Sequence, residues 1–124
     1  MEVLDGLETT LKNCRLYYHW QFKKEADAPV VLLLHGWGCD SSIFSFIENG
    51  LSEDALSVDF PGHGKSGDPP EPWGVQDYAE QILLLLDELS LPKVDAVAHS
   101  FGGRVALWLA SHQPERVDRL VITG

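Results

Sequence analysis

The stretch K-V-D-A-V-A-H-S-F-G-G at residues 93–103 constrains the fold more than any other part of the sequence. Residues 94–98 are a short apolar run with β-branched side chains, which is typical of a buried strand in a parallel sheet. A helical pattern follows at residues 104–113, so the chain must turn from strand to helix around Ser100. The neighbours of this turn are small, as a tight turn requires: Ala98, Gly102 and Gly103. Such a turn holds the serine hydroxyl clear of the sheet at a helix N-terminus, where negative charge is stabilised.

The rest of the chain predicts alternating strands and helices after an N-terminal hairpin. Loosely alternating apolar and polar residues predict antiparallel strands at residues 7–11 and 15–22, which turn at Lys12 and Asn13. A polar loop is expected at residues 23–29. Further strands are predicted at residues 30–34, 55–59, 94–98 and 119–123, and helices at residues 43–48, 75–90 and 104–113. This order predicts a single α/β domain over residues 1–124, with a mostly parallel sheet and helices on both faces.

The composition narrows the possible partners. The 124 residues carry a formal net charge of -10 and the nine basic residues are scattered, which argues against binding to nucleic acid or to an anionic membrane. The two cysteines, Cys14 and Cys39, form neither a disulfide framework nor a metal-ligand spacing, so we expect no metal and no cofactor. The longest apolar runs are too short to span a membrane and the N-terminus lacks a signal-peptide core, so a cytoplasmic protein is expected.

A glycine-rich loop, G-H-G-K-S-G at residues 62–67, follows a predicted strand and matches the G-x-G-x-x-G pattern of dinucleotide-binding turns. It also comes close to a phosphate-binding loop that ends in G-K-S. Neither interpretation holds. Asp59 would occupy the first glycine position of the phosphate-binding loop, and the residues D-P-P stand where a helix should begin. We therefore expect no nucleotide at this loop.

Three segments, each directly after a predicted strand, form a set. They are H-G-W-G at residues 35–38, D-F-P-G-H-G-K-S at residues 59–66 and A-H-S-F-G-G at residues 98–103. In this order and spacing the set resembles the α/β-hydrolase fold superfamily, in its esterase- and lipase-like branch with a serine nucleophile. The resemblance extends from about residue 7 to residue 124. Ala98 stands where this pattern most often has glycine, which is a small departure.

The resemblance implies a role for each matched position. Ser100 is the expected nucleophile, which attacks a carbonyl carbon and forms an acyl-enzyme with a small-molecule acyl substrate. The backbone N–H groups of Trp37 and Phe101 are the expected oxyanion donors. Structural support is expected from His35, Gly36, Gly102 and Gly103, and a substrate pocket from Trp37, Phe101 and Trp73. The competing structural interpretation makes Ser100 a helix N-cap.

In this fold the acid and the histidine of the catalytic triad follow the serine along the chain. Both are therefore expected after the strand at residues 119–123, where the sequence ends. The chain is expected to be the N-terminal portion of an incomplete α/β-hydrolase fold, ending before the lid and the last strands. An unprotected edge strand is then expected to make the chain poorly stable or to lead to homodimerisation.

Two other functions stay open. The run Gly102-Gly103-Arg104 is similar to the menaquinone-pathway synthase, a lyase-type member of the superfamily in which an arginine after the glycines helps to hold carboxylates. The competing interpretation of Arg104 is a helix-surface charge. A non-catalytic binding module or an inactive fragment would use the fold without the triad. The serine itself argues against the family's haloalkane dehalogenases and epoxide hydrolases, which carry aspartate at that position.

Overall fold

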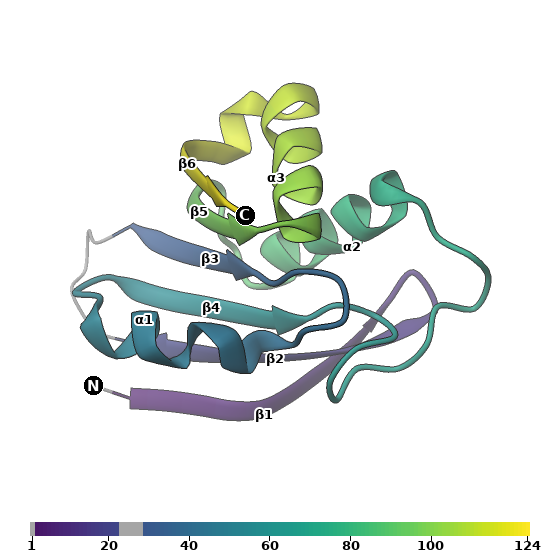
Figure 1. Cartoon of the computed structure of the whole chain (residues 1–124), viewed down its shortest axis with the longest axis horizontal. Helices are drawn as coiled ribbons and strands as arrows, with labels where there is room; N and C mark the ends of the chain where they lie inside the picture. Colours follow the sequence, from purple (N-terminus) through teal and green to yellow (C-terminus); the bar gives the residue numbers. More distant parts are fainter. Residues whose placement is uncertain (1, 23–28) are drawn as a thin grey trace.

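A six-stranded sheet runs through the molecule in the order β1-β2-β4-β3-β5-β6 (Figure 1). The computed structural model describes residues 2–22 and 29–124. The strands are β1 (Glu2–Leu11), β2 (Cys14–Phe22), β3 (Val30–Leu34), β4 (Asp54–Asp59), β5 (Val94–His99) and β6 (Val117–Thr123). β2 pairs antiparallel with both β1 and β4. The other neighbouring pairs, β4 with β3, β3 with β5 and β5 with β6, are parallel. The predicted α/β fold with an N-terminal hairpin is confirmed.

The hairpin turns where the sequence predicts, but its first strand is longer. Lys12 and Asn13 have φ angles of 55° and 57°, the left-handed conformation that a two-residue hairpin turn needs at both positions. β1 begins at Glu2 rather than at residue 7, with a register shift between Leu4 and Leu7. Gly6 lies within that shift and has a φ of 76°. Irregular pairing therefore extends β1 toward its N-terminal end, over residues whose sequence does not alternate as a regular strand does.

Helices cover both faces of the sheet, as predicted. α2 (Val75–Glu88) and α3 (Phe101–His112) pack on one face over the larger apolar core, which contains Leu32 and Leu34 of β3. The alternate residues Val31 and Leu33 point to the other face, where they pack with Phe44. Phe44 ends the 3₁₀ helix η1 (Ser41–Phe44), which leads directly into the short helix α1 (Ser45–Gly50).

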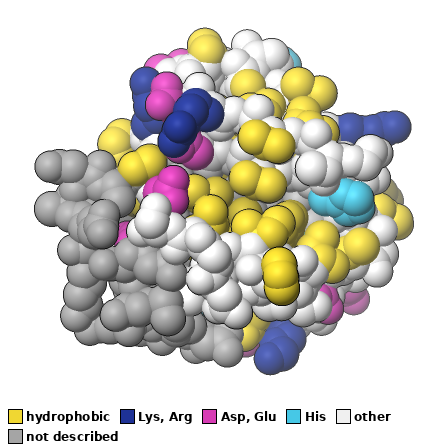
Figure 2. All heavy atoms as spheres, turned by 60° about the vertical axis from the view of Figure 1, so that its left-hand side comes forward, with side chains coloured by type: hydrophobic (Ala, Val, Ile, Leu, Met, Phe, Trp, Pro, Cys, Tyr) yellow, Lys and Arg dark blue, Asp and Glu magenta, His cyan; other side chains and the backbone are white. Residues whose placement is uncertain are grey.

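The face that carries α1 stays partly open toward the last strands. Figure 2 shows apolar side chains gathered in the middle of the face turned toward the viewer. A shallow hollow over β3, β5 and β6 is lined in part by Val31, Leu51, Val97 and Val121, and Val121 is 55% exposed. The outer edge of β6 has no partner strand among the described residues.

The other element boundaries differ from the predicted ones by up to three residues, including helix α1, which was predicted at residues 43–48. β5 continues to His99 and α3 begins at Phe101, so Ser100 alone separates strand from helix. The helix predicted at residues 75–90 ends at Glu88, and Ser90 takes a positive φ of 58°. Of the loop expected at residues 23–29, all but Pro29 lies outside the described residues. In the described part of the chain, no helix has the length and apolar character needed to cross a bilayer.

Candidate active site

Ser100 is an exposed residue held in an unusual backbone conformation. Its φ is 52° and its ψ is -111°, a combination that costs an ordinary residue about 1–3 kcal/mol. Although Ser100 occupies the N-cap position of α3, its side chain makes no capping hydrogen bond, so the N-cap interpretation of this serine is wrong. The hydroxyl has no hydrogen-bond partner among residues 2–22 and 29–124, and the residue precedes the first residue of α3 directly.

The surrounding backbone stabilises this turn. The Ser100 N–H donates to the Thr123 carbonyl oxygen (2.9 Å), and the Ser100 carbonyl accepts from the Gly103 N–H (2.9 Å). A Cβ on Gly102 would overlap the Leu34 carbonyl oxygen and would lie 2.7 Å from the carbonyl oxygen of His35. Because backbone atoms cannot move aside as a flexible side chain can, only glycine fits beside the ends of β3 and β5.

The loop after β3, residues 35–40, passes directly beside Ser100 and is called the β3 loop below. A Cβ built on Gly36 would lie 3.3 Å from the Ser100 Cβ. The Cys39 N–H donates to the Gly36 carbonyl (3.1 Å), and Gly38 has a φ of 81°, which together define a type II β-turn with Trp37 and Gly38 at its centre. Neither the Trp37 amide nor the Phe101 amide donates to any acceptor in the described part of the chain.

His35 is fully buried at the end of β3 and both its ring nitrogens are engaged by the backbone. Nδ1 donates to the Gly36 carbonyl (2.7 Å), and Nε2 accepts from the Phe60 N–H (2.9 Å). Burial lowers the pKa of His35, because the charged form would lose its solvation. A neutral ring with its proton on Nδ1 satisfies both bonds, so His35 ties the β3 loop to the loop that follows β4.

Asp59 is a buried carboxylate that the sequence analysis did not assign to the site. Its Oδ1 accepts from the Ser41 N–H (2.8 Å) and its Oδ2 from the Lys65 N–H (2.9 Å), so it anchors the start of η1 and the glycine-rich loop together. Gly64 lies so close that a Cβ would overlap the carboxylate. The second glycine of the G-x-G-x-x-G match, Gly64, thus makes room for a carboxylate of the protein itself. The only signal for this in the sequence is the position of Asp59 at the end of a buried strand.

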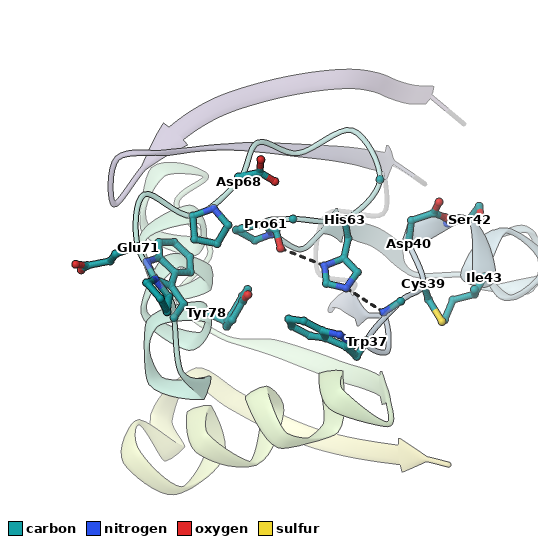
Figure 3. Close-up of a pocket in the computed structure, with 16 residues that line it drawn as sticks. Trp37, Cys39, Asp40, Ser42, Ile43, Pro61, His63, Asp68, Glu71 and Tyr78 are labelled. Atoms are coloured by element: carbon teal, nitrogen blue, oxygen red, sulfur yellow. Dashed lines mark hydrogen bonds between the residues drawn. The ribbon is translucent and has the colours of Figure 1, made fainter.

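An open groove of about 1160 Å³ lies beside the β3 loop (Figure 3). Trp37, Trp73 and Tyr78 line it, together with Pro61 and His63 from the loop after β4. Its aromatic residues lie edge to face, with ring centroids 5.3 Å apart for Trp73 and Tyr78. Two of the three predicted pocket residues, Trp37 and Trp73, are therefore brought to one groove.

Phe101, the third predicted pocket residue, lies behind the groove rather than in its lining. Its ring packs against Trp37 (5.2 Å between centroids) and Tyr78 (5.3 Å). Ser100 does not line the groove either. Trp37 connects the two, because its ring forms part of the groove wall while its backbone belongs to the loop beside the serine.

The sequence matches a known family over most of its length. Residues 29–124 match the family described as alpha/beta hydrolase fold. The chain belongs to this family. An uncharacterized protein of Mycobacterium tuberculosis is 34% identical over 109 residues, which are 86% of this chain and 32% of that protein.

Solved structures of α/β hydrolases share the fold. A hydrolase from Pseudomonas aeruginosa matches with a TM-score of 0.85 and 30% identity, over 95% of this chain and 46% of its own. The enol-lactonase from Burkholderia xenovorans matches with a TM-score of 0.87 and 25% identity, over 92% of this chain and 45% of its own. This α/β hydrolase chain therefore spans about a third of the curated relative and less than half of each structure.

No histidine or carboxylate of the described residues hydrogen-bonds the Ser100 hydroxyl. The five histidines have other partners: His19 pairs with Glu48, His35 and His63 with loop backbone, His99 with Thr123 and His112 with the Trp108 carbonyl. No cluster of His, Cys, Asp or Glu among the residues described could hold a metal ion. The site as described thus combines an exposed serine with two unpaired amides.

Proposed function

We propose that this α/β hydrolase cleaves acyl bonds of the ester or thioester type through an acyl-enzyme on Ser100. The observation that carries the proposal is the left-handed φ of Ser100, which costs stability and is held by contacts to β3, β6 and α3. Strain maintained by so many contacts is typical of a functional residue. A serine whose only role was to begin a helix would not require a strained backbone.

In the proposed reaction Ser100 Oγ forms a bond to the carbonyl carbon of the substrate and loses its proton to a general base. The carbonyl oxygen becomes an oxyanion, which accepts hydrogen bonds from the Trp37 and Phe101 amides. The carbon–oxygen or carbon–sulfur bond to the leaving group then breaks, and the leaving group takes up the proton. Water attacks the acyl-enzyme in the same way and releases the acid. The triad acid and histidine are proposed to come from residues that follow β6 in a longer chain.

Three observations support this reaction. The two amides have no acceptor in the described part of the chain, and one of them belongs to the loop that passes beside Ser100. One structural neighbour is an enol-lactonase, and a lactone is a cyclic ester. The groove walled by Trp37 and Trp73 offers an apolar surface for a small-molecule substrate. A cytoplasmic location is part of the proposal, in keeping with the free thiols of Cys14 and Cys39.

The synthase-like alternative receives no support from the position of Arg104. Its side chain is exposed on α3, and it does not line the groove. This fits the helix-surface charge that the sequence already favoured. A non-catalytic role is an outcome of the experiment below.

The direct test is labelling of the chain with a fluorophosphonate, followed by mass spectrometry of its peptides. We expect one adduct, on Ser100, and none in Ser100→Ala. Without a triad base the reaction is expected to be very slow, because loss of the base costs a complete triad on the order of a millionfold in turnover. Ser111→Ala is the matched control, because Ser111 is also an exposed serine of the α3 region and its hydroxyl donates to the Leu107 carbonyl (2.7 Å). Equal labelling of Ser111 and Ser100, or none of Ser100, would reject the nucleophile and favour the non-catalytic role.

A further inference from the structure

His63 joins the two loops that border the groove. It belongs to the loop after β4, residues 60–72, called the β4 loop below. Its Nε2 accepts a hydrogen bond from the Gly38 N–H of the β3 loop (2.9 Å), and its Nδ1 lies 3.1 Å from the Pro61 carbonyl oxygen. Figure 3 shows the ring between these two partners, with Trp37 beneath it. The sequence analysis left this residue without a role.

The partners of His63 determine its tautomer. A carbonyl oxygen faces Nδ1, so Nδ1 carries the proton, and an amide N–H faces Nε2, so Nε2 must present its lone pair. Protonation of Nε2 would set two N–H groups against each other. His63 therefore holds the β3 loop only as the neutral ring with Nδ1 protonated.

His63 and His35 each form a hydrogen bond that joins the β3 loop and the β4 loop, and the side that supplies the histidine differs between the two bonds. His35 comes from the end of β3 and accepts an amide of the β4 loop, whereas His63 comes from the β4 loop and accepts an amide of the β3 loop. The two ring centroids are 5.2 Å apart. Each ring also donates from Nδ1 to a carbonyl close to it in sequence. The two loops thus cannot shift against each other without the loss of at least one of these bonds.

The hydrogen bond from the Gly38 N–H to His63 holds the Trp37–Gly38 peptide, which directly follows the proposed oxyanion donor, the Trp37 N–H. The Trp37–Gly38 peptide is the central peptide of the type II turn, and a flip of this peptide converts a type II turn into type I. After such a flip the Trp37 carbonyl would face Nε2, so two acceptors would oppose each other. The peptide before it is held by the Gly36 carbonyl, which accepts from His35 and from Cys39. The two histidines therefore fix two successive peptides, and the Trp37 N–H belongs to the first of them.

We propose that His63 is a positioning residue: it sets the direction of the Trp37 amide by fixing the next peptide through Gly38 and by packing on the Trp37 ring. The centroids of the two rings are 4.7 Å apart at 79°. Trp37 is 64% exposed, and its ring packs against His63, Phe101 and Tyr78. The consequence for catalysis rests on the proposed role of Ser100. His63 is not the base of this reaction, because both its nitrogens are engaged by backbone groups.

Two substitutions separate the hydrogen bond from the packing. His63→Phe keeps a flat ring against Trp37 and removes the acceptor for Gly38. His63→Gln places an amide oxygen near the position of Nε2 and restores the acceptor. His112→Gln is the matched control, since His112 is an exposed histidine at the end of α3, stacked on Trp108 (4.0 Å between centroids).

The first measurement is the fluorophosphonate reaction at Ser100, resolved into a binding constant and a maximal rate. We expect His63→Phe to lower the maximal rate by roughly 10- to 100-fold and to change binding by less than about threefold, because a small displacement of an oxyanion donor acts on the transition state. His63→Gln should recover most of the rate, and His112→Gln should match the wild type. Equal rates for His63→Phe and the wild type would overturn the proposal.

The second measurement does not depend on Ser100. Nitrogen NMR of the wild-type histidine rings should show His63 with its proton on Nδ1, and the Gly38 amide should exchange its hydrogen faster in His63→Phe than in the wild type or in His63→Gln. Unchanged Gly38 exchange in His63→Phe would overturn the role of His63 even if Ser100 is labelled. Absent labelling in every variant would instead reject the nucleophile, and the Gly38 exchange would still decide the role of His63.

Discussion

The turn at Ser100 and the β3 loop lie side by side, but they are specified in different ways. The turn depends on the absence of side chains, since the Cβ atoms missing from Gly102 and Gly103 leave room for the carbonyls of Leu34 and His35 and for the Ile122 side chain. The β3 loop depends on polar side chains that come from elsewhere: His63 accepts from Gly38 within the loop, and Asp59 accepts from Ser41 directly after it. Both arrangements restrain the backbone. Only the turn at Ser100 is specified by residues next to it in the sequence, and the predictions below test this contrast.

The largest effect is expected from Gly102→Ala. The added methyl group would overlap backbone oxygens that cannot move without a shift of β3 or α3, so we expect a loss of about 3 kcal/mol or more in the free energy of unfolding. Urea denaturation followed by circular dichroism measures it. Gly50→Ala is the control, because a Cβ there meets nothing within 4 Å. A stability loss below about 1 kcal/mol for Gly102→Ala would show that the turn tolerates side chains after all.

A smaller loss of stability is expected from Asp59→Asn, which tests the restraint of the loops by polar side chains. One of the two backbone N–H groups, of Ser41 or Lys65, would then face an amide NH₂ instead of a carboxylate oxygen. Loss of a buried hydrogen bond to a charged group should cost about 2 kcal/mol. The same denaturation experiment measures it. Asp118→Asn, on the exposed surface of β6, should change stability by less than about 0.5 kcal/mol. Similar losses for the two variants would contradict the bracing role of Asp59.

The smallest effect concerns pH and His35. Burial lowers the pKa of His35 in the folded protein below its ordinary value of 6.5, so in acid the unfolded chain binds a proton that the folded chain does not bind. Stability should therefore be complete above about pH 7 and fall as the pH drops through 6.5, by at most about 1.4 kcal/mol per pH unit, until the folded pKa is reached. Denaturation at pH 7.5, 6 and 5 measures the slope. His35→Gln should flatten it, whereas an unchanged slope would place the proton uptake elsewhere.

Much of the fold follows from patterns local to the sequence. The buried runs of β3 and β4, the hairpin turn at Lys12 and Asn13 and the amphipathic helix α2 are visible within short windows, because burial and turn chemistry act on neighbouring residues. The start of β1 escaped prediction, since the irregular pairing around Gly6 breaks the alternation that identifies a strand. The start of α3 was predicted three residues too late, because Phe101, Gly102 and Gly103 are poor signals for a helix start.

The candidate site could be predicted in part. Ser100, Trp37 and the glycines stand in short motifs, whereas the bond from Gly38 to His63 joins residues 25 positions apart. Such a bond depends on the parallel register of β3 and β4, which aligns the two loops at one edge of the sheet. A sequence pattern does not contain that register. For the same reason His63 looked like an ordinary loop residue and Asp59 like the last residue of a buried strand.

The outermost strand of the sheet also supports the backbone of Ser100. Thr123 of β6 accepts the Ser100 N–H through its carbonyl, and its hydroxyl lies 3.0 Å from Nδ1 of the neighbouring His99. The free edge of β6 is therefore only one strand away from the serine backbone. A strand docked along that edge, whether from a second copy of the chain or from further residues of a longer one, would brace the serine from outside. Binding of a strand at this edge would then increase the reactivity of Ser100, and loss of that strand would decrease it.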